Sequence, residues 1–354
     1  MKIIQLGAKI GPGKKAGKGN AGDTAIGSAF EYLFAKEFPS SKIEFMNCRK
    51  IFSTSDIDTI NQADLLFLSG GGVFLYDTFP NNVSDWQWGI SEELLEQIKI
   101  PIIVYAIGYN KFRNQRNFNG LFDKTVTKLV EKSIFFSMRN TGSCLSVQNH
   151  IPKNLSNKVK LNFCPTLMLN EKYKFQNSHS TKNVGFVFGG DRLHLRHTDL
   201  NKFFEQINIF VNYLKQNGIK TILVNHLNDT WIKEYLTFDA EIDLFEKDAE
   251  YIYKKYSEID TVVADRGHGQ MIPLACGCKI MTPISHDKLS WFLKDMGLSH
   301  FGIEESDPML GKKLIQRYNE LSDLNWDLMH KQIMQKIKQT YQTNFQFIKN
   351  RLQL

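Results

Sequence analysis

The sequence predicts an α/β protein made of two Rossmann-like domains, each a parallel sheet covered by helices. Strand-like and helix-like patterns alternate along most of the chain, which is typical of parallel sheets whose strands are joined by helices. The chain has 354 residues, too many for one ordinary core, so two domains of about 150–180 residues are expected. The alternation stops at the polar segment 170–183 (NEKYKFQNSHSTKN) and then resumes, so this segment is the expected linker.

In the first half of the chain, the pattern of apolar residues predicts five strands and three helices. The apolar run 64–69 (DLLFLS) breaks into three glycines, as a buried parallel strand would. Residues 24–38 are expected to form an amphipathic helix, because apolar side chains from Ile26 to Phe34 recur on one face. In chain order, the expected strands are residues 2–7, 42–47, 64–69, 101–107 and 134–138, and the expected helices are residues 24–38, 91–98 and 121–132.

The second half repeats this pattern and ends in a helical segment. The expected strands are residues 184–188, 220–225, 261–264 and 279–281, and the expected helices are residues 202–216, 249–256 and 270–276. From Lys312 on, an apolar stripe that reaches from Ile333 to Leu352 predicts a helix with one packed face. We therefore expect an N-terminal domain over 1–172, a C-terminal domain over 173–310, and a helical segment over 311–354 that packs on them. Two such domains facing a cleft form the glycosyltransferase-B type of architecture.

Composition narrows the classes of function. A net charge of +7, spread along the chain without a basic block, suits an anionic substrate or an anionic membrane surface but does not indicate nucleic acid. The start of the chain lacks the pattern of a signal peptide, and no segment reaches the ~18 apolar residues of a membrane span. The five cysteines are an odd set without the spacing of a zinc site. A cytoplasmic protein with reduced, buried thiols is expected.

Glycine-rich loops follow two of the expected strands, where open α/β sheets bind ligands. The loop 11–23 ends in GNAGD, and Asp23 or Thr24 is expected to cap the helix after it. It matches neither a P-loop nor the dinucleotide fingerprint, and a structural loop is the alternative. Residues 70–72 (GGG) either turn backbone N–H groups toward a ligand or make a tight turn.

Cationic residues follow several other strands. Arg139 and Arg192 stand just past expected strands, and the strand 261–264 leads into 265–269 (DRGHG) and then a helix, with Lys288 twenty residues after His268. A helix N-terminus and an arginine suit an anion, and a histidine can move a proton near neutral pH. Each residue alone has a structural alternative: a surface salt bridge, an ion pair of Arg266 with Asp265 or another acid, a capping histidine, a solvated lysine. Their repetition at strand ends favours one anion-binding active site.

Taken in order, these motifs resemble the polysaccharide pyruvyl transferase family. The matching segments are 19–23 (GNAGD), 68–74 (LSGGGVF), 105–108 (YAIG), 138–143 (MRNTGS), 266–269 (RGHG), 274–277 (LACG), 286–288 (HDK) and 295–297 (DMG), so the resemblance spans roughly residues 5–298. The chain departs from the family where Asn140 replaces a usual aspartate, where Gly267 replaces a bulkier residue, and at Cys164-Pro165, where Asp-Pro is common.

The resemblance implies a transfer of the enolpyruvyl unit of phosphoenolpyruvate onto two hydroxyls of one sugar, giving a cyclic ketal and phosphate. It implies that the donor is bound by Arg139, Arg192, Arg266 and Lys288, that His268 is the general acid, and that Asn20 orients a hydroxyl or a donor oxygen. The backbone of Gly22, Gly71 and Gly72 is expected beside the ligand. No metal or cofactor is expected, and the acceptor would be a sugar or a lipid-linked glycan, with peripheral contact at the inner face of the membrane.

Two other functions stay open. A nucleotide-sugar glycosyltransferase of the same architecture would also need cations for a diphosphate, and often a glutamate for the ribose, for which residues 285–290 offer no clear candidate. A non-catalytic anion- or glycan-binding protein would keep the fold and release no phosphate.

Overall fold

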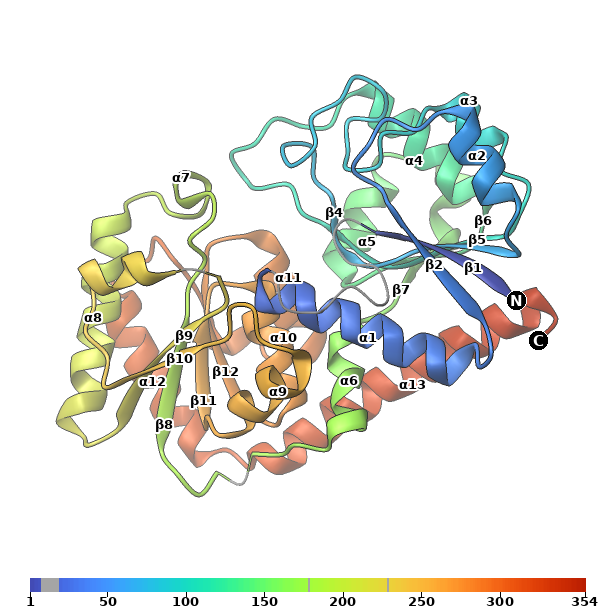
Figure 1. The fold of residues 1–354 in the computed structure, drawn as a ribbon. Coiled ribbons are helices and arrows are strands. Elements are labelled where there is room, and N and C mark those ends of the chain that lie inside the picture. The colour runs from blue at the N-terminus through green and yellow to red at the C-terminus, as the bar shows by residue number, and fades with distance from the viewer. Residues whose placement is uncertain (8–18, 178, 228) are drawn as a thin grey trace.

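The computed structural model describes residues 1–7, 19–177, 179–227 and 229–354 and contains two parallel β-sheets joined by helices (Figure 1). The N-terminal sheet has the strand order β2-β1-β3-β5-β6-β7, with β4 added beside β5. Its strands are β1 (Lys2–Gly7), β2 (Lys42–Asn47), β3 (Leu65–Leu68), β4 (Gly71–Phe74), β5 (Ile102–Tyr109), β6 (Ser133–Met138) and β7 (Val159–Leu161). Its helices are α1 (Ala21–Glu37), α2 (Thr54–Asn61), α3 (Glu92–Glu96), α4 (Gly120–Lys132), α5 (Thr141–Gln148), α6 (Thr166–Tyr173) and the short 3-10 helix η1 (Lys153–Lys158).

The C-terminal sheet has the strand order β10-β9-β8-β11-β12-β13, again all parallel. Its strands are β8 (Asn183–Val187), β9 (Lys220–Asn225), β10 (Ala240–Asp243), β11 (Thr261–Ala264), β12 (Lys279–Ile284) and β13 (Gly302–Glu304). The helices of this half are α7 (Leu193–Arg196), α8 (Leu200–Gln216), α9 (Ala249–Ser257), α10 (Gly267–Ala275), α11 (Asp287–Met296), α12 (Leu310–Asp323) and α13 (Trp326–Leu352), with the 3-10 helices η2 (Thr230–Glu234) and η3 (Ser299–Phe301).

The inner strands β3, β5 and β6 of the N-terminal sheet are buried on both faces, which explains why they are apolar runs rather than alternating ones. Successive side chains point to opposite faces. In β3, Leu65 and Phe67 join the core beneath α1, whereas Leu66 and Leu68 join a second core under α2, α3 and α4. The first of these cores continues without a break into the C-terminal sheet, so the two halves share apolar packing.

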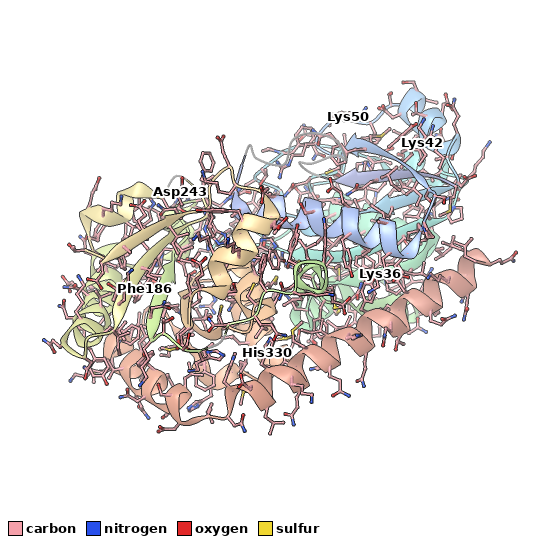
Figure 2. The ribbon with its side chains drawn as sticks, turned by 60° about the horizontal axis from the view of Figure 1, so that its bottom comes forward. Lys36, Lys42, Lys50, Phe186, Asp243 and His330 are labelled. Atoms are coloured by element: carbon pink, nitrogen blue, oxygen red, sulfur yellow. The ribbon has the colours of Figure 1, made fainter. Side chains whose placement is uncertain are left out.

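Helices α1 and α13 tie the two halves together. Helix α1 belongs to the N-terminal half but packs against α9 and α10 as well as α6. Helix α13 starts under the C-terminal sheet, where His330 donates a hydrogen bond to the Leu274 carbonyl (2.8 Å), and ends against the N-terminal half (Figure 2). There Lys349 pairs with Glu37 (2.8 Å). The apolar stripe of α13 is a packed face, as predicted: Ile333, Ile337, Tyr341, Phe345 and Ile348 are buried.

Several predicted boundaries are wrong in ways that matter for the site. Helix α1 starts at Ala21 with Asn20 as its N-cap, so neither Asp23 nor Thr24 caps it. Helix α10 starts at Gly267, three residues earlier than predicted, which puts His268 in its first turn. The glycine triplet is not a simple turn, because Gly71 opens strand β4. The predicted domain boundaries at 172 and 310 stay predictions.

All five cysteines are buried and none forms a disulfide, which confirms the expectation of buried free thiols. Among the helices in the described ranges, none has both the length and the apolar character needed to cross a bilayer.

Candidate active site

A cavity of about 220 Å³ lies between the two sheets, at the carboxyl ends of their strands. The N-terminal half contributes residues that follow β2, β5 and β6, and the C-terminal half contributes residues that follow β8, β9, β11 and β12. This is where open α/β sheets place their ligands. The cationic residues that line it are Arg49, Arg139, Arg192, Arg196, Arg266 and Lys288.

The cavity is strongly positive. Six cationic side chains line it, against two carboxylates, Asp23 and Asp191, among the described residues. Two of the arginines are buried with an unsatisfied donor: within the described part of the chain, neither Arg139 Nε nor Arg266 Nε has a hydrogen-bond partner. A buried donor without a partner is costly, so such groups point to a ligand that accepts from them.

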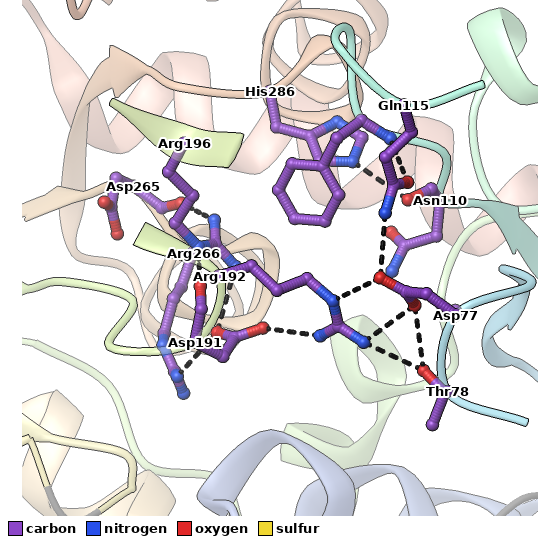
Figure 3. A network of polar contacts seen from close by, with 12 residues as sticks. Asp77, Thr78, Asn110, Gln115, Asp191, Arg192, Arg196, Asp265, Arg266 and His286 are labelled. Carbon is purple, nitrogen blue, oxygen red and sulfur yellow. Dashed lines mark hydrogen bonds and ion pairs between the residues drawn. The ribbon is translucent and has the colours of Figure 1, made fainter. Parts of the chain in front are cut away.

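Asp191 holds three of the arginines in place (Figure 3). Its Oδ1 accepts hydrogen bonds from Arg196 Nη2 and Arg266 Nη2, both at 3.1 Å, and its Oδ2 lies 3.1 Å from Arg192 Nη1. Burial acts to raise the pKa of Asp191, but the surrounding arginines and Lys288 outweigh it and hold that pKa well below its ordinary value. One carboxylate shared by three guanidinium groups positions them without neutralising them.

Asn110 connects cations from the two halves. Its Oδ1 accepts a hydrogen bond from Lys288 Nζ (2.9 Å) and another from Arg139 Nη2 (3.2 Å). Burial, with Arg196 and Arg139 nearby, holds the pKa of Lys288 well below its ordinary value. Gly108 makes room for this arrangement, because a Cβ there would lie 2.5 Å from Arg139 Nε. The cations are therefore brought close together before any anion binds.

His268 lies at the point where the N-termini of α1 and α10 meet. Its Nε2 is 3.8 Å from Cys164 Sγ, and a Cβ on Gly22 would lie only 2.4 Å from its Nδ1. Burial, followed by the charges of Arg139, Lys288 and Arg266, lowers the pKa of His268 to about 3. The imidazole is therefore neutral in the ligand-free protein near neutral pH, and a bound anion would raise this pKa by offsetting those charges.

The N-terminus of α10 adds backbone donors to the same place. Arg266 is its N-cap residue, and the Arg266 side chain makes no capping hydrogen bond with the described first turn of the helix. The first amides of a helix carry no intrahelical hydrogen bond and bear a partial positive charge, which suits phosphate or carboxylate oxygens. Gly267 borders the cavity, and a Cβ there would have only Lys288 Cε, at 3.9 Å, within reach. This position is open space beside the ligand site.

The structure brings together most residues predicted for the site. Those that line the cavity are Asn20, Gly72, Arg139, Arg192, Arg266, His268 and Lys288. Gly22 does not line it but contacts the His268 ring, and Gly71 lines a smaller adjoining pocket. Asn20 Oδ1 accepts the Gly22 N–H (2.8 Å) to cap α1, which leaves its Nδ2 group as the donor for a ligand.

Arg192 and Arg266 also have protein partners. Arg192 forms a two-pronged ion pair with Asp77 (2.7 and 2.8 Å), which reaches across from the N-terminal half, so this arginine connects the two sides of the cavity. Arg266 pairs with Asp191 rather than with Asp265. Asp265 instead accepts a hydrogen bond from the Gly189 N–H (2.6 Å) and so supports the loop that carries Arg192.

The departure at Asn140 has a structural explanation. Asn140 is the N-cap of α5, and its Oδ1 accepts a hydrogen bond from the Ser143 N–H (2.7 Å), as an aspartate would at this place. This cap keeps the end of β6, and with it Arg139, in the conformation that reaches the cavity.

Sequence reasoning missed several residues of the site. Arg49 and Asn110 stand one or two residues past β2 and β5, so the rule that found Arg139 and Arg192 would have found them too. Arg192 and Arg196 stand at the two ends of the short helix α7: Arg192 is its N-cap residue, and Arg196 is its last residue. His226 stands directly past β9, so the same rule would have found it as well. Cys164 carries no such signal, because its part in the site depends on how the two halves meet.

Comparisons with known proteins agree with this architecture. The model of the family described as polysaccharide pyruvyl transferase matches residues 20–287. No curated protein sequence matches the chain. Similar solved structures include S. aureus MnaA with UDP (TM-score 0.55, 9% identity, covering 94% of this chain and 90% of that one). Another is the UDP-GlcNAc 2-epimerase of Neisseria meningitidis bound to UDP-GlcNAc (TM-score 0.54, 12% identity, 95% and 94%).

The UDP-GlcNAc 2-epimerase of Methanocaldococcus jannaschii is similar to the same degree (TM-score 0.53, 13% identity, 92% and 94%). At these identities the likeness shows the fold, which is the predicted glycosyltransferase-B type with two Rossmann-like domains. The family match covers most of the chain and includes every residue of the cavity except Lys288, which is the next residue after it. The chain belongs to the polysaccharide pyruvyl transferase family.

Proposed function

We propose that the protein transfers the enolpyruvyl unit of phosphoenolpyruvate onto two hydroxyls of one sugar in a glycan, forming a cyclic pyruvate ketal and releasing phosphate. The observation that carries this proposal is the cavity with six cationic side chains around a histidine. Phosphoenolpyruvate brings a carboxylate and a phosphate of about −1.5 to −2 charge, which suits the excess of positive charge. The donor itself is the only small molecule that this reaction needs besides the acceptor.

The donor-binding groups are Arg139, Arg266, Lys288 and the N-terminus of α10. Guanidinium groups bind carboxylate and phosphate in two-pronged fashion, and the unsatisfied Nε atoms of Arg139 and Arg266 supply donors for this purpose. Arg192, already held by Asp77, adds positive charge at the edge of the cavity.

His268 is the proposed general acid. Binding of the anionic donor offsets the surrounding charge, so the imidazole takes up a proton beside the substrate. The imidazolium then gives this proton to the methylene carbon of the donor, which leaves a cation at the ketal carbon. The first sugar hydroxyl attacks that carbon and returns its proton to His268. The second hydroxyl then attacks the same carbon, and the bond from that carbon to the phosphate oxygen breaks. The proton of the second hydroxyl goes to the departing phosphate, and the ring is closed.

The reaction is tested by incubating the protein with phosphoenolpyruvate and galactosides, mannosides or N-acetylmannosamine-containing acceptors, and measuring phosphate release and the mass of the product. We expect one phosphate released per ketal formed. His268→Gln should lower kcat by 10²–10⁴-fold, the usual value of positioned proton transfer, with a smaller change in KM for the donor. If the variant keeps kcat within a few-fold of the parent, His268 is not the general acid.

A nucleotide-sugar glycosyltransferase is distinguished by its donor. The residue at the start of α11 that could hold a ribose is Asp287, and Arg113 already binds it (2.6 Å). We therefore expect phosphoenolpyruvate, and not UDP or another nucleoside diphosphate, to raise the melting temperature. The reverse result would favour glycosyl transfer. Binding of either donor without any phosphate or nucleotide release would favour a non-catalytic binding protein.

The proposed place of action is the cytoplasm, at the inner face of the membrane, on a lipid-linked acceptor. Five unpaired buried cysteines suit a reducing compartment, and the net charge of +7 suits an anionic lipid surface. Fractionation of cells that produce the tagged protein should find it with membranes at low salt and release it at high salt. A protein that stays in the supernatant at low salt would contradict this placement.

A further inference from the structure

A second, smaller pocket opens from the active-site cavity and lies between α1 and the N-terminal sheet. It has a volume of about 70 Å³ and shares Asp23, Arg49, Gly72 and Gln87 with the cavity. A volume of this size admits a substituent of a few heavy atoms but not a whole sugar ring. None of the steps assigned to the phosphoenolpyruvate site uses it.

The walls of this pocket differ from those of the cavity. Ile26 and Phe30 of α1 and Val73 of β4 supply an apolar side. Gln5 of β1 and the backbone of the glycine triplet supply a polar one. Gln5 is buried at 5% exposure, and within the described ranges its carboxamide has no hydrogen-bond partner. It also borders a hollow at the other end of α1. A buried carboxamide without a partner is expected to bind a group that both donates and accepts.

Gly71 helps to keep the pocket open. Its φ is +120°, which L side chains rarely adopt. A Cβ there would point toward the pocket wall, 3.8 Å from Ile26 Cδ1.

The distance between the pocket and His268 matches the distance between opposite edges of one sugar ring. Gly22 of α1 touches the His268 ring, and Ile26 is four residues further along the same helix. Four residues advance a helix by about 6 Å. A sugar whose two reacting hydroxyls face His268 would therefore direct the substituent on its opposite edge toward Ile26 and Gln5.

We propose that this pocket receives an acetamido group of the acceptor sugar, so that the enzyme selects a 2-acetamido sugar over the corresponding sugar with a hydroxyl. The acetamido methyl contacts Ile26 and Phe30. The acetamido N–H and C=O pair with the Gln5 carboxamide. A hydroxyl or hydroxymethyl group would leave the apolar side uncovered. Arg49 at the mouth of the pocket donates two hydrogen bonds to the Gln87 carboxamide (2.6 and 2.9 Å). This inference rests on the proposed pyruvyl transfer.

The test compares matched acceptors: methyl β-glycosides of N-acetylglucosamine and glucose, and of N-acetylmannosamine and mannose, each with saturating phosphoenolpyruvate. For the better of the two acetamido acceptors, we expect the parent enzyme to have a kcat/KM at least 10-fold higher than for the matched hydroxyl acceptor. This is the scale on which a pocket discriminates one small group. Gln5→Leu and the pocket-filling Ile26→Phe should each reduce that preference to within 3-fold. They should leave kcat/KM for the hydroxyl acceptor and KM for the donor unchanged. Gln339→Leu, on the exposed face of α13, is the matched control and should change nothing.

Two results would overturn the inference: a parent enzyme without a preference, or variants that lower kcat/KM equally for both acceptors of a pair. Turnover with none of the acceptors would count against the proposed pyruvyl transfer. In that case saturation-transfer NMR with the N-acetylglycosides and inorganic phosphate tests directly whether the pocket binds an acetamido group. The inference is supported if the acetamido methyl is saturated by the parent protein and this saturation is lost in Gln5→Leu. The inference is refuted if the parent protein does not saturate the methyl.

Discussion

At the scale of single residues, the environment of His268 decides when it carries a proton. Cys164 places a sulfur 3.8 Å from its Nε2, and Thr166 donates a hydrogen bond to that sulfur (3.2 Å). Burial raises the pKa of the Cys164 thiol, so this neighbour is neutral. Cations lie near the imidazole on other sides: Arg139 just past β6, Arg266 at the start of α10, and Lys288 in α11. Burial lowers the pKa of the neighbouring His226 well below its ordinary value, so His226 is neutral. The proton on His268 thus depends on what the cavity contains.

Cys164→Asp should raise the pKa of His268 from about 3, because a carboxylate beside the imidazolium stabilises the charged form. The change is measured by following the imidazole Cε1–H signal by NMR across pH 3 to 9 in the ligand-free protein. The pH–rate profile should move to higher pH in the same variant. Cys164→Ser, which adds no charge, is the control. An Asp variant whose imidazole titrates like the parent would show that Cys164 does not control this proton.

Donor binding should be accompanied by proton uptake near pH 6 to 7. Burial and, after it, the charges of Arg139, Lys288 and Arg266 hold the pKa of His268 at about 3. Anionic phosphoenolpyruvate, the proposed donor, would offset those charges, so the pKa rises. Calorimetric titrations in two buffers of different ionisation enthalpy measure the uptake, which we expect to approach one proton per site. His268→Gln should abolish it. Equal uptake in parent and variant would assign the proton to another group.

At the scale of elements, the site depends on the meeting of two helix N-termini. Helix α1 is held there by the Ala21 N–H, which donates a hydrogen bond to the His226 carbonyl (2.9 Å), and by the Asn20 cap. Gly22 lets α1 approach the His268 ring closely, so the position of the N-terminal helix sets the orientation of a side chain on α10.

Gly22→Ala should lower kcat by about 10-fold or more without preventing folding. The added Cβ would lie 2.4 Å from His268 Nδ1 and must displace the ring or the start of α1, and such overpacking costs about 1–3 kcal/mol. Steady-state kinetics and the free energy of unfolding measure the two effects. Gly120→Ala, at the start of α4 with nothing within 4 Å, is the matched control; it should leave activity unchanged and stability equal or slightly higher. Full activity in the Gly22 variant would mean that the contact with His268 is unimportant.

At the scale of the whole molecule, both polar contacts and apolar packing join the two halves of the chain. Thr141 of α5 donates two hydrogen bonds to Asp295 of α11 (2.6 and 2.7 Å). Arg113 binds Asp287 and Glu304, both of the C-terminal half. At the base, α13 crosses from one half to the other, and Phe345 packs between Phe38 and Tyr105.

Phe345→Ala should destabilise the protein by about 3–5 kcal/mol, the cost of emptying a buried aromatic site, because Phe345 is only 2% exposed. Phe347→Ala, two residues further along α13 and 39% exposed, should cost less than about 1 kcal/mol. Chemical denaturation of both variants measures the difference. Similar losses would show that α13 is not anchored through its buried face.

The sequence alone predicted those features that depend on residues close together in the chain. Strands β1, β2, β9 and β11 have the predicted bounds. For β1, β9 and β11 the reason is that a buried parallel strand is a nearly continuous apolar run. Cations placed just past strands led to Arg139, Arg192 and Arg266. Short helices such as α5 and α6 were missed because they lack an apolar period, being buried on several sides by the other half. Asp77, Asn110 and Cys164 could not be assigned roles, since their partners lie more than 100 residues away or across the cavity.

The shared core beneath α1 limits how this enzyme could be recombined with its relatives. Helix α1 follows β1 in the chain, yet it packs on α9 and α10, and α13 returns from the last residues to seal the first sheet. Consider a chimera that joins the first half of one relative to the second half of another at the linker. In it, α1 and α13 would each pack against residues from a different protein. Exchange of acceptor or donor specificity by domain shuffling would therefore need the facing residues of α1 and α13 to be transplanted with the half they contact.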